Sequence, residues 1–283
     1  MPWAFSDQVD DYAEHASGLL NERPVENTIA LTMIETLRAG RRWSSEPMLF
    51  GWYDTGPGEV QPSGAISITP PYELLLSVVP DGTVAELVAA LRGRGVQLPG
   101  VNADDAPADR FAAAWTAGTA LHAEMRMHTR LYALRALEAV TPAPAGRPRR
   151  AVEADGELAM AWFAAFQIEA GAHEVDADSV VRYRIANGLM WVWELDDGEV
   201  VSLAGRNAAA AGVSRVGPVY TPPEHRRRGY GAAVTAACTA DALAGDADHV
   251  VLFTDLANPT SNSIYRRIGY RPVCDRKVIH FIG

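Results

Sequence analysis

A run of three arginines followed by two glycines is the segment of this sequence best suited to bind a ligand. Arg226, Arg227 and Arg228 precede Gly229 and Gly231. The glycines let the backbone approach a ligand without a Cβ in the way. Where such a loop opens a helix, free amides and the positive end of the helix dipole favour a phosphate or pyrophosphate. The pattern predicts an anion-binding cradle; a solvated arginine run at an ordinary helix start is the alternative.

Two predicted elements hold this loop in place. A strand is expected from Val213 to Tyr220 and an alanine-rich helix from Gly231 to Leu243. Pro222 and Pro223 stop the strand before the arginines. The loop lacks the third glycine of a dinucleotide-binding fingerprint, because Val234 occupies that position. We therefore expect a phosphate cradle that is not of the Rossmann type.

A second set of polar residues follows a predicted buried strand from Val250 to Thr254. Asn258, Asn262 and Tyr265 stand in or just before a predicted short helix from Ser261 to Ile268. A phenol has a pKa of about 10, so Tyr265 holds a proton at neutral pH and can give it to a thiolate whose conjugate acid has a pKa of about 8.5. Packing of this tyrosine on the sheet is the alternative.

Together the two segments resemble the GNAT superfamily of N-acetyltransferases. In that family an Arg/Gln-x-x-Gly-x-Gly/Ala loop between a strand and a helix binds the pyrophosphate of acetyl-CoA, and residues 226–231 match it. An asparagine, a helical tyrosine and a Gly-Phe/Tyr pair follow there, as do Asn258, Tyr265 and Gly269-Tyr270 here. The resemblance covers about residues 151–283. It implies acetyl-CoA as cosubstrate and no metal.

The resemblance also implies roles for individual residues. The backbone of Val219 to Thr221 is expected along the pantetheine arm, where the strand splays from its neighbour and opens a V-shaped cleft. Tyr265 is the expected general acid and Asn258 an arm contact, whereas Asn262 either helps the arm contact or stabilises its helix. The residues assigned to acetyl-CoA are Val219, Tyr220, Thr221, Arg226, Arg227, Arg228, Gly229, Tyr230, Gly231, Ala232, Asn258 and Asn262.

The implied reaction is direct transfer of an acetyl group from acetyl-CoA to an amine of a small molecule or peptide. A backbone amide near Val219 or Tyr220 is expected to stabilise the oxyanion. Asp255, Glu224 and His225 are candidates for a general base, and none of them is selected. Two alternatives stay open: a non-catalytic CoA-binding or regulatory protein, and a relative of the tandem acetyltransferase that completes mycothiol.

Other chemistries find little support in the sequence. Lys277 is the single lysine, and no Gly-Lys-Ser/Thr occurs, which excludes kinases and P-loop nucleotidases. Cys238 and Cys274 form neither a CxxC motif nor a disulfide framework. No HExxH motif occurs, and His122 and His128 are better explained as surface or core residues than as metal ligands.

Charge limits the partners. The 283 residues carry a formal charge of −10, of which residues 1–140, with 10 basic and 18 acidic side chains, hold −8. Nucleic acid and anionic membranes are therefore poor partners, and a cationic amine is the expected acceptor. No targeting or membrane-spanning segment is found, and the cysteine usage favours the cytoplasm. The sequence predicts no oligomeric state.

The chain is expected to hold two domains. Residues 141–150 contain three prolines and three arginines and are predicted to be a linker between domains 1–140 and 151–283. A weak internal repeat relates residues 49–54 to 190–194, and Thr69-Pro-Pro to Thr221-Pro-Pro. The predicted fold is α+β with two GNAT-like units, each a mostly antiparallel mixed sheet flanked by helices. The acetyl-CoA cleft is expected in the C-terminal unit. The N-terminal unit lacks the arginine-glycine cradle and is predicted to be degenerate, lining the acceptor cleft.

Overall fold

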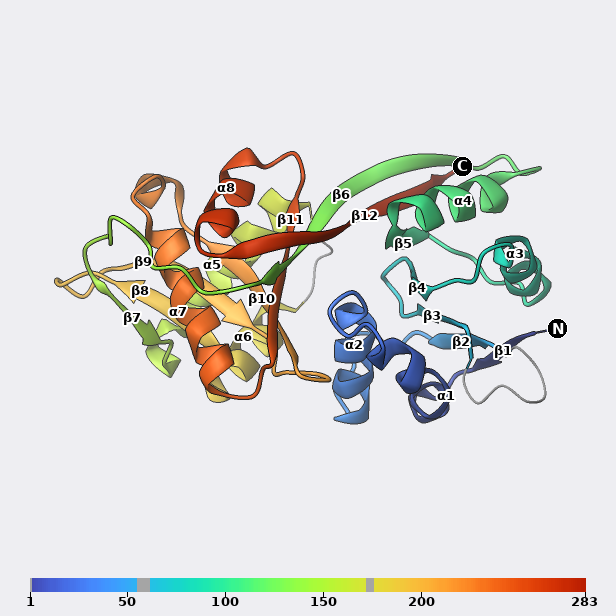
Figure 1. Cartoon of the computed structure of the whole chain (residues 1–283), viewed down its shortest axis with the longest axis horizontal. Helices are drawn as coiled ribbons and strands as arrows, with labels where there is room; N and C mark the ends of the chain where they lie inside the picture. Colours follow the sequence, from blue (N-terminus) through green and yellow to red (C-terminus); the bar gives the residue numbers. More distant parts are fainter. Residues whose placement is uncertain (1, 55–61, 172–175) are drawn as a thin grey trace. The chain divides into compact units, whose positions relative to one another are not determined.

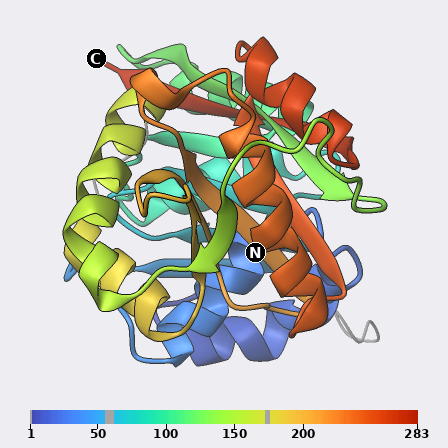
Figure 2. The same cartoon turned by 90° about the vertical axis from the view of Figure 1, so that its left-hand side faces the viewer.

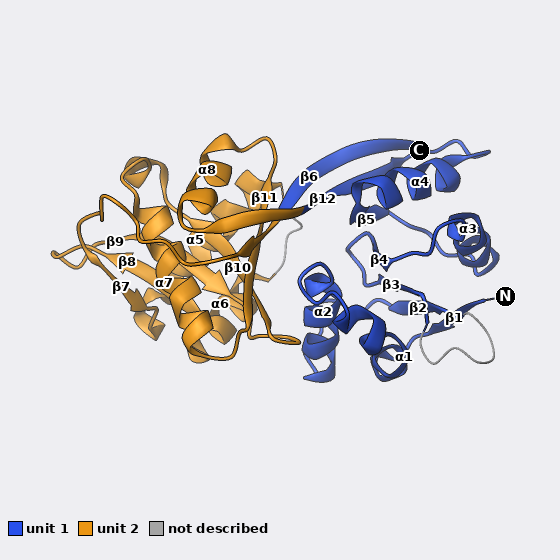
Figure 3. Ribbon diagram, in the orientation of Figure 1, with its two compact units in different colours: residues 1–130, 274–283 blue, residues 131–273 orange. Residues whose placement is uncertain are grey.

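The computed structural model of the chain describes residues 2–54, 62–171 and 176–283. The chain forms two compact units, which Figure 3 colours separately. Unit 1 contains residues 1–130 and 274–283, and unit 2 contains residues 131–273. Two long strands, β6 (His122–Leu134) and β12 (Tyr270–Ile282), each begin in one unit and end in the other.

Unit 1 is an open sheet with helices, seen with its element labels in Figure 1. Its strands are hydrogen-bonded in the order β1-β2-β3-β4-β5-β12. All neighbours are antiparallel except β4 and β5, which are parallel. Besides the long strands, its elements are β1 (Trp3–Ser6), α1 (Val9–Asn21), α2 (Thr28–Arg38), β2 (Leu49–Tyr53), β3 (Gly64–Ile68), β4 (Leu74–Val78), α3 (Val84–Gly93), β5 (Gly100–Asp104) and α4 (Asp105–Thr116).

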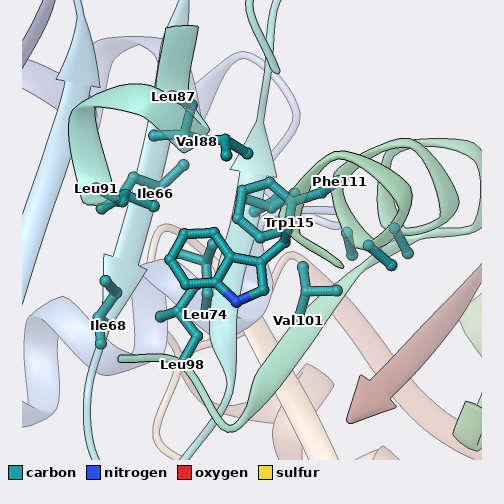
Figure 4. Packing of buried hydrophobic residues seen from close by; sticks show 14 of the residues in the cluster. Ile66, Ile68, Leu74, Leu87, Val88, Leu91, Leu98, Val101, Phe111 and Trp115 are labelled. Atoms are coloured by element: carbon teal, nitrogen blue, oxygen red, sulfur yellow. The ribbon is translucent and has the colours of Figure 1, made fainter. Parts of the chain in front are cut away.

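The core of unit 1 forms where α3 and α4 cover the sheet. Leu87 and Leu91 of α3 and Phe111 of α4 are completely buried, and Trp115 is 5% exposed. Figure 4 shows these side chains gathered over Ile66 and its neighbours on the central strands. Residues spaced four apart lie on one face of a helix, so each helix presents an apolar stripe to the sheet.

The last strand of the chain completes this unit. Residues 276–280 of β12 pair antiparallel with β5, from Arg276 opposite Asp104 to His280 opposite Gly100. Phe281, in the same segment, is 8% exposed and lies in the core of unit 1. The first unit therefore depends on residues encoded at the far end of the sequence.

Unit 2 contains the predicted cradle. Its strands follow the order β12-β6-β11-β10-β9-β8-β7. β10 and β11 are parallel, whereas the pairs β10–β9, β9–β8 and β8–β7 are antiparallel. Its elements are β7 (Arg147–Arg150), η1 (Glu153–Asp155), α5 (Gly156–Ala170), α6 (Ala177–Ala186), β8 (Met190–Glu194), β9 (Val200–Arg206), β10 (Val213–Tyr220), η2 (Pro223–His225), α7 (Tyr230–Ala244), β11 (His249–Asp255) and α8 (Pro259–Arg267).

The two faces of the unit 2 sheet are covered by different helices. Ala204 and Val216 pack in the cluster that includes α7, whereas Leu203 and Tyr220 pack in the cluster of α5 and α6. Neighbouring strand residues point to opposite faces, so these two clusters lie on opposite sides of the strands. Figure 2 views this unit with the orange α7 and the yellow-green α5 on either side of the sheet.

The two units share one order of elements. Each runs strand, two helices, three strands, helix, strand, helix and strand, and each has its parallel pair at the same place, β4 with β5 or β10 with β11. This confirms the predicted fold class of two similar units built from a mostly antiparallel mixed sheet and flanking helices. Among the described residues the strands of both units are hydrogen-bonded in one continuous series of twelve, rather than in two separate sheets.

Several details differ from the expectations. Residues 147–150 are strand β7, paired with β8, rather than linker, and the compact units divide within β6 and β12. An edge strand tolerates proline and arginine because one side of its backbone needs no partner in the sheet. Thr69-Pro-Pro follows β3, whereas Thr221-Pro-Pro follows β10, the counterpart of β4, so that part of the repeat was misaligned.

Besides β7, strands β1, β4 and β5 escaped the sequence patterns. β1 is four residues long and β4 and β5 five each, without the alternation that marks a half-buried strand. β12 starts at Tyr270, and its first half carries charged residues and pairs through its backbone. None of the helices in the described ranges has both the length and the apolar character needed to cross a membrane.

The contribution of β12 to unit 1 can be tested by truncating one side chain. We expect Phe281→Ala to lower the free energy of unfolding by about 3 kcal/mol, because it leaves a cavity between β12 and α4. The neighbouring Ile282 is 39% exposed, so Ile282→Ala should cost less than about 1 kcal/mol. Urea unfolding of both variants measures the difference; equal losses would contradict the burial of Phe281 in this core.

Candidate functional site

The site begins where two parallel strands separate. β10 and β11 pair only from Val213 opposite His249 to Arg215 opposite Val251, although β10 continues to Tyr220. On its other side β10 stays paired with β9 up to Tyr220 and carries one extra residue between Val216 and Val219. This bulge adds twist to β10, and the edge of residues 216–220 that faces away from β9 is left without a strand partner. β10 and β11 therefore part beyond Arg215, as the resemblance implies.

The cradle follows β10 directly. Residues 221–229 lead through η2 into α7, and Gly229 caps this helix with a φ of +89°, a left-handed conformation that favours glycine. A Cβ on Gly231 would lie 3.2 Å from Thr221 Oγ1, so the first turn of α7 approaches the end of β10 closely. Both glycines of the motif have a structural reason to be glycine.

The backbone amides of residues 227–232 indicate that the loop can bind an anion. None of them has a hydrogen-bond acceptor among the described residues, and the first bond of the helix is from Ala233 N to Gly229 O at 3.0 Å. Six adjacent free N–H groups at a helix start form an anion site, because the helix dipole adds to their partial charges.

The three arginines have different roles. Arg226 donates to Thr221 O at 2.8 Å and forms a two-pronged ion pair with Glu169 of α5, with both distances 2.8 Å. The hydrogen bond to Glu169 raises the pKa of Arg226 above its ordinary value. Arg227 and Arg228 are exposed and form no ion pair within the described part of the chain. Arg226 therefore fixes the loop to α5, and the guanidinium groups of the other two arginines are available to bind an anion.

Tyr220 and Thr221, at the end of β10, are held by contacts with β9 and with α5. The Ser202 hydroxyl of β9 donates to Tyr220 O at 2.9 Å and therefore accepts from the Thr221 hydroxyl at 2.8 Å. The Tyr220 ring packs against Trp162, and burial together with Glu169 raises the pKa of its hydroxyl. This end of β10 is rigidly held although it lacks a neighbour on one side.

The two asparagines beyond β11 differ in their contacts. Asn258 caps α8: its side-chain oxygen accepts from Ser261 N at 3.0 Å, and its exposed side-chain amide group has no partner among the described residues. Asn262 is 8% exposed; its amide group donates to Asp255 O at 2.8 Å and Asn258 O at 2.7 Å. Its oxygen accepts from the Tyr132 hydroxyl at 2.9 Å. Of the two roles open for Asn262, these contacts support the structural one, and Asn258 keeps a free donor.

Tyr265 lies on α8 with its ring in the core and its hydroxyl uncommitted. The side chain is 8% exposed and packs edge-on against Tyr270. Its hydroxyl forms no hydrogen bond within the described residues, yet it is not among the unpartnered atoms sealed from solvent. Burial raises the pKa of Tyr265 to about 12. The group is a protonated phenol that lacks a partner on the protein.

The candidate bases have other contacts or none. His225 Nε2 lies 3.3 Å from Glu199, and the other ring nitrogen is buried without a partner. Asp255 accepts from Ala257 N at 2.8 Å in a turn before α8, and Glu224 is exposed. Geometry gives no reason to select one of them.

Comparison with known proteins identifies the fold. Residues 195–278 match the model of the FR47-like protein family. A Drosophila protein of known structure is 17% identical, with a TM-score of 0.68 over 99% of this chain and 98% of its own. A GNAT-family acetyltransferase from Colwellia psychrerythraea is 11% identical, with a TM-score of 0.57 over 99% of each chain. The chain has the fold of the GNAT-family acetyltransferases, and its residues 195–278 match the FR47-like family model.

A tandem structure is also similar over nearly the whole chain. The tandem GNAT protein from the clavulanic acid biosynthesis pathway is 12% identical, with a TM-score of 0.51 over 99% of this chain and 98% of its own. A search of curated proteins found no match. The GNAT fold predicted from the sequence is confirmed, and the family-model match covers the cradle, Asn258 and Tyr265.

Unit 1 has the GNAT fold without the cradle. The segment that joins β4 to α3 is residues 79–83, where Pro80, Asp81 and Gly82 replace the arginines of unit 2. Thr83 closes this turn, since its amide and hydroxyl both donate to Pro80 O, at 3.2 and 2.9 Å. A short, acidic turn that satisfies its own backbone groups is unsuited to a pyrophosphate.

Two residues that contact the candidate site were not predicted from the sequence. Glu169 holds Arg226, and Tyr132 of β6 accepts from Arg266 Nε at 3.1 Å while it donates to Asn262. Both lie far from the motifs in sequence, and no local pattern marks them. Only the topology, which places β6 beside β11, could have revealed Tyr132.

One group of side chains among the described residues has the spacing of metal ligands. Asp105, His128 and Asp275 of unit 1 offer atoms within 4.8 Å of one another. Arg130 already forms a two-pronged pair with Asp275, at 2.6 and 2.7 Å, and His128 lies 3.0 Å from both Asp105 oxygens. These pairs account for the cluster without an ion.

A side chain at Gly229 tests the cradle. Gly229→Asp should abolish the thermal stabilisation that acetyl-CoA, the ligand implied by the resemblance, gives the protein, because it adds a negative charge within the run of free amides and strains the helix start at a φ of +89°. Gly198 offers a matched control: its φ is +88° in the turn between β8 and β9, with nothing within 4 Å of an added Cβ. Gly198→Asp should keep the shift, measured by thermal melting with and without acetyl-CoA. An equal shift in both variants would count against the cradle.

Proposed function

We propose that this protein is an acetyl-CoA-dependent N-acetyltransferase that transfers the acetyl group directly to an amine. The observation that carries the proposal is one juxtaposition at the carboxyl ends of β10 and β11. Six free backbone amides open α7 after one strand, and an unpartnered tyrosine hydroxyl lies on α8 after the other. Ligands of open α/β sheets bind at the carboxyl ends of such strands.

The residues of the cradle fit the phosphates of acetyl-CoA. The amides of residues 227–232 offer six donors, and the exposed guanidinium groups of Arg227 and Arg228 add two positive charges beside them. The open edge of residues 216–220 offers backbone groups to the amides of a pantetheine arm, and Asn258 adds a side-chain donor. Both ends of an extended ligand would thus find partners.

The proposed chemistry needs little from the protein beyond positioning and one proton. Acetyl-CoA supplies the acetyl group as a thioester, which an amine can attack. The chain holds the reactants together, and a free amide near Val219 or Tyr220 stabilises negative charge on the carbonyl oxygen. The Tyr265 hydroxyl gives its proton to the departing thiolate, which leaves as a thiol.

We propose a cationic amine as acceptor. Glu169, Glu224 and Asp255 all lie in or next to the elements that bound the opening, and the chain as a whole carries −10. Negative charge attracts an ammonium group but also raises its pKa, so the acceptor must lose a proton to solvent or to one of these carboxylates before it attacks. Nucleic acid and anionic membranes do not fit this charge.

Replacement of Tyr265 tests the proton donor. Tyr265→Phe should lower kcat for acetylation by about 100-fold or more, because the thiolate would leave unprotonated. The affinity for acetyl-CoA should stay within a factor of about two, since the cradle is untouched. Tyr270→Phe is the matched control: Tyr270 packs on Tyr265, and among the described residues its hydroxyl bonds only to Thr239, at 2.7 Å.

CoA release over a panel of amines measures these rates, with acetyl-CoA binding followed in parallel. Equal rates for Tyr265→Phe and the wild type would exclude the proposed role of the tyrosine. Binding of acetyl-CoA without turnover on any amine would overturn the enzyme and support a CoA-binding regulatory protein instead.

The pH profile provides a separate test. Because burial raises the pKa of Tyr265 to about 12, the phenol stays protonated over the usual assay range. The rate should therefore rise with pH as the acceptor amine loses its proton, with no fall up to about pH 10. A decline with an apparent pKa near that of an ordinary tyrosine would contradict the assignment.

A further inference from the structure

Two arginines of unit 2, Arg184 and Arg215, lie on the face of the sheet that α5 and α6 cover. The guanidinium of Arg184, on α6, lies against Gly205 of β9, where an added Cβ would be 3.1 Å from Arg184 Nη1. Arg215 of β10 lies opposite Asn207, whose amide donates to Arg215 O at 3.1 Å. Gly205 is two residues before Asn207, so it shares a sheet face with Arg215 as a diagonal neighbour about 7 Å away. Both guanidinium groups therefore reach the same region.

Neither arginine has a counter-charge among the described residues. The Nη1 atoms of Arg184 and Arg215 are both sealed from solvent without a hydrogen-bond partner, and neither side chain forms an ion pair with any described residue. Burial lowers the pKa of each to about 10, and in Arg184 the charge of Arg215 adds to this effect. Two partly buried cations that repel each other, each with one sealed donor, destabilise the fold unless something neutralises them.

Two arginines that are more deeply buried than Arg184 and Arg215 are each paired with carboxylates. Arg206 in unit 2 is 6% exposed and pairs with Asp241 and Asp246, at 3.3 and 3.1 Å. Arg276 in unit 1 is 4% exposed and pairs with Asp104 at 2.8 Å. The chain therefore supplies carboxylates to buried guanidinium groups, and their absence at Arg184 and Arg215 marks this place as different.

We propose that Arg184 and Arg215 bind a small divalent oxyanion, such as a phosphate or sulfate group, between α6 and β10. A dianion would neutralise both charges and accept from the two sealed Nη1 donors. The site is separate from the cradle, since Arg215 precedes Thr221 by six residues, roughly 20 Å along an extended strand. The inference does not depend on the proposed acetyl transfer.

Inorganic phosphate is the probe, and the full-length Gly229→Asp protein is the parent, so that the cradle is disabled. Phosphate should raise the Tm of the parent by roughly 3 °C at ten times its Kd, against sodium chloride at equal ionic strength. Arg184→Met and Arg215→Met should lose this shift. Without phosphate both should melt above the parent, because each removes an uncompensated buried charge.

Arg182→Met is the matched control. Arg182 lies on the same helix, 63% exposed and paired with Asp178, so its loss should leave both the Tm and the phosphate shift unchanged. Calorimetric titration of phosphate gives a readout that does not depend on unfolding: one site per chain in the parent and in Arg182→Met, and none in the other two. No site in the parent, or equal binding in all variants, would overturn the proposal.

Discussion

The hydrogen bonding between β10 and β11 stops after three residue pairs, and the site depends on that break. If the two parallel strands stayed paired, the inner edge of β10 would be filled by β11 and no extended ligand could lie along it. The bulge between Val216 and Val219 and the bond from Ser202 to Tyr220 hold β10 on its other side while it diverges. The cradle and α8, which begin where the strands end, are thereby set apart across an opening.

The residue types in the sequence were enough to locate the cradle between β10 and α7, but not to assign different roles to its three arginines. The glycines, the prolines and the apolar strand before them fix the loop between β10 and α7, and β10 was predicted to the residue. Three adjacent arginines look alike in sequence, whereas in space a single carboxylate, Glu169, distinguishes Arg226 from the other two. Asn258 and Asn262 likewise differ only in the folded structure, because Tyr132 of the distant strand β6 donates a hydrogen bond to the side chain of Asn262.

The same limit explains which parts of the fold were missed. The sequence patterns predicted α7 and α8 to within two residues of their observed bounds, since each helix buries one set of side chains. They failed for β7 and for the first half of β12, whose side chains are charged and whose backbone bonds alone make them strands. The internal repeat was misaligned at Thr69, because Thr69-Pro-Pro follows β3 whereas Thr221-Pro-Pro follows β10, the counterpart of β4.

The pairing of β5 with β12 has a consequence for how the chain is made. β5 ends at Asp104, and its partner in β12 begins at Arg276, so most of unit 2 must leave the ribosome before β5 gains its second neighbour. At about 5–20 residues per second, this interval lasts on the order of ten seconds or more. During that time β5 is an unprotected edge over an open core, which is the state in which nascent sheets associate with one another and in which a chaperone has most to offer.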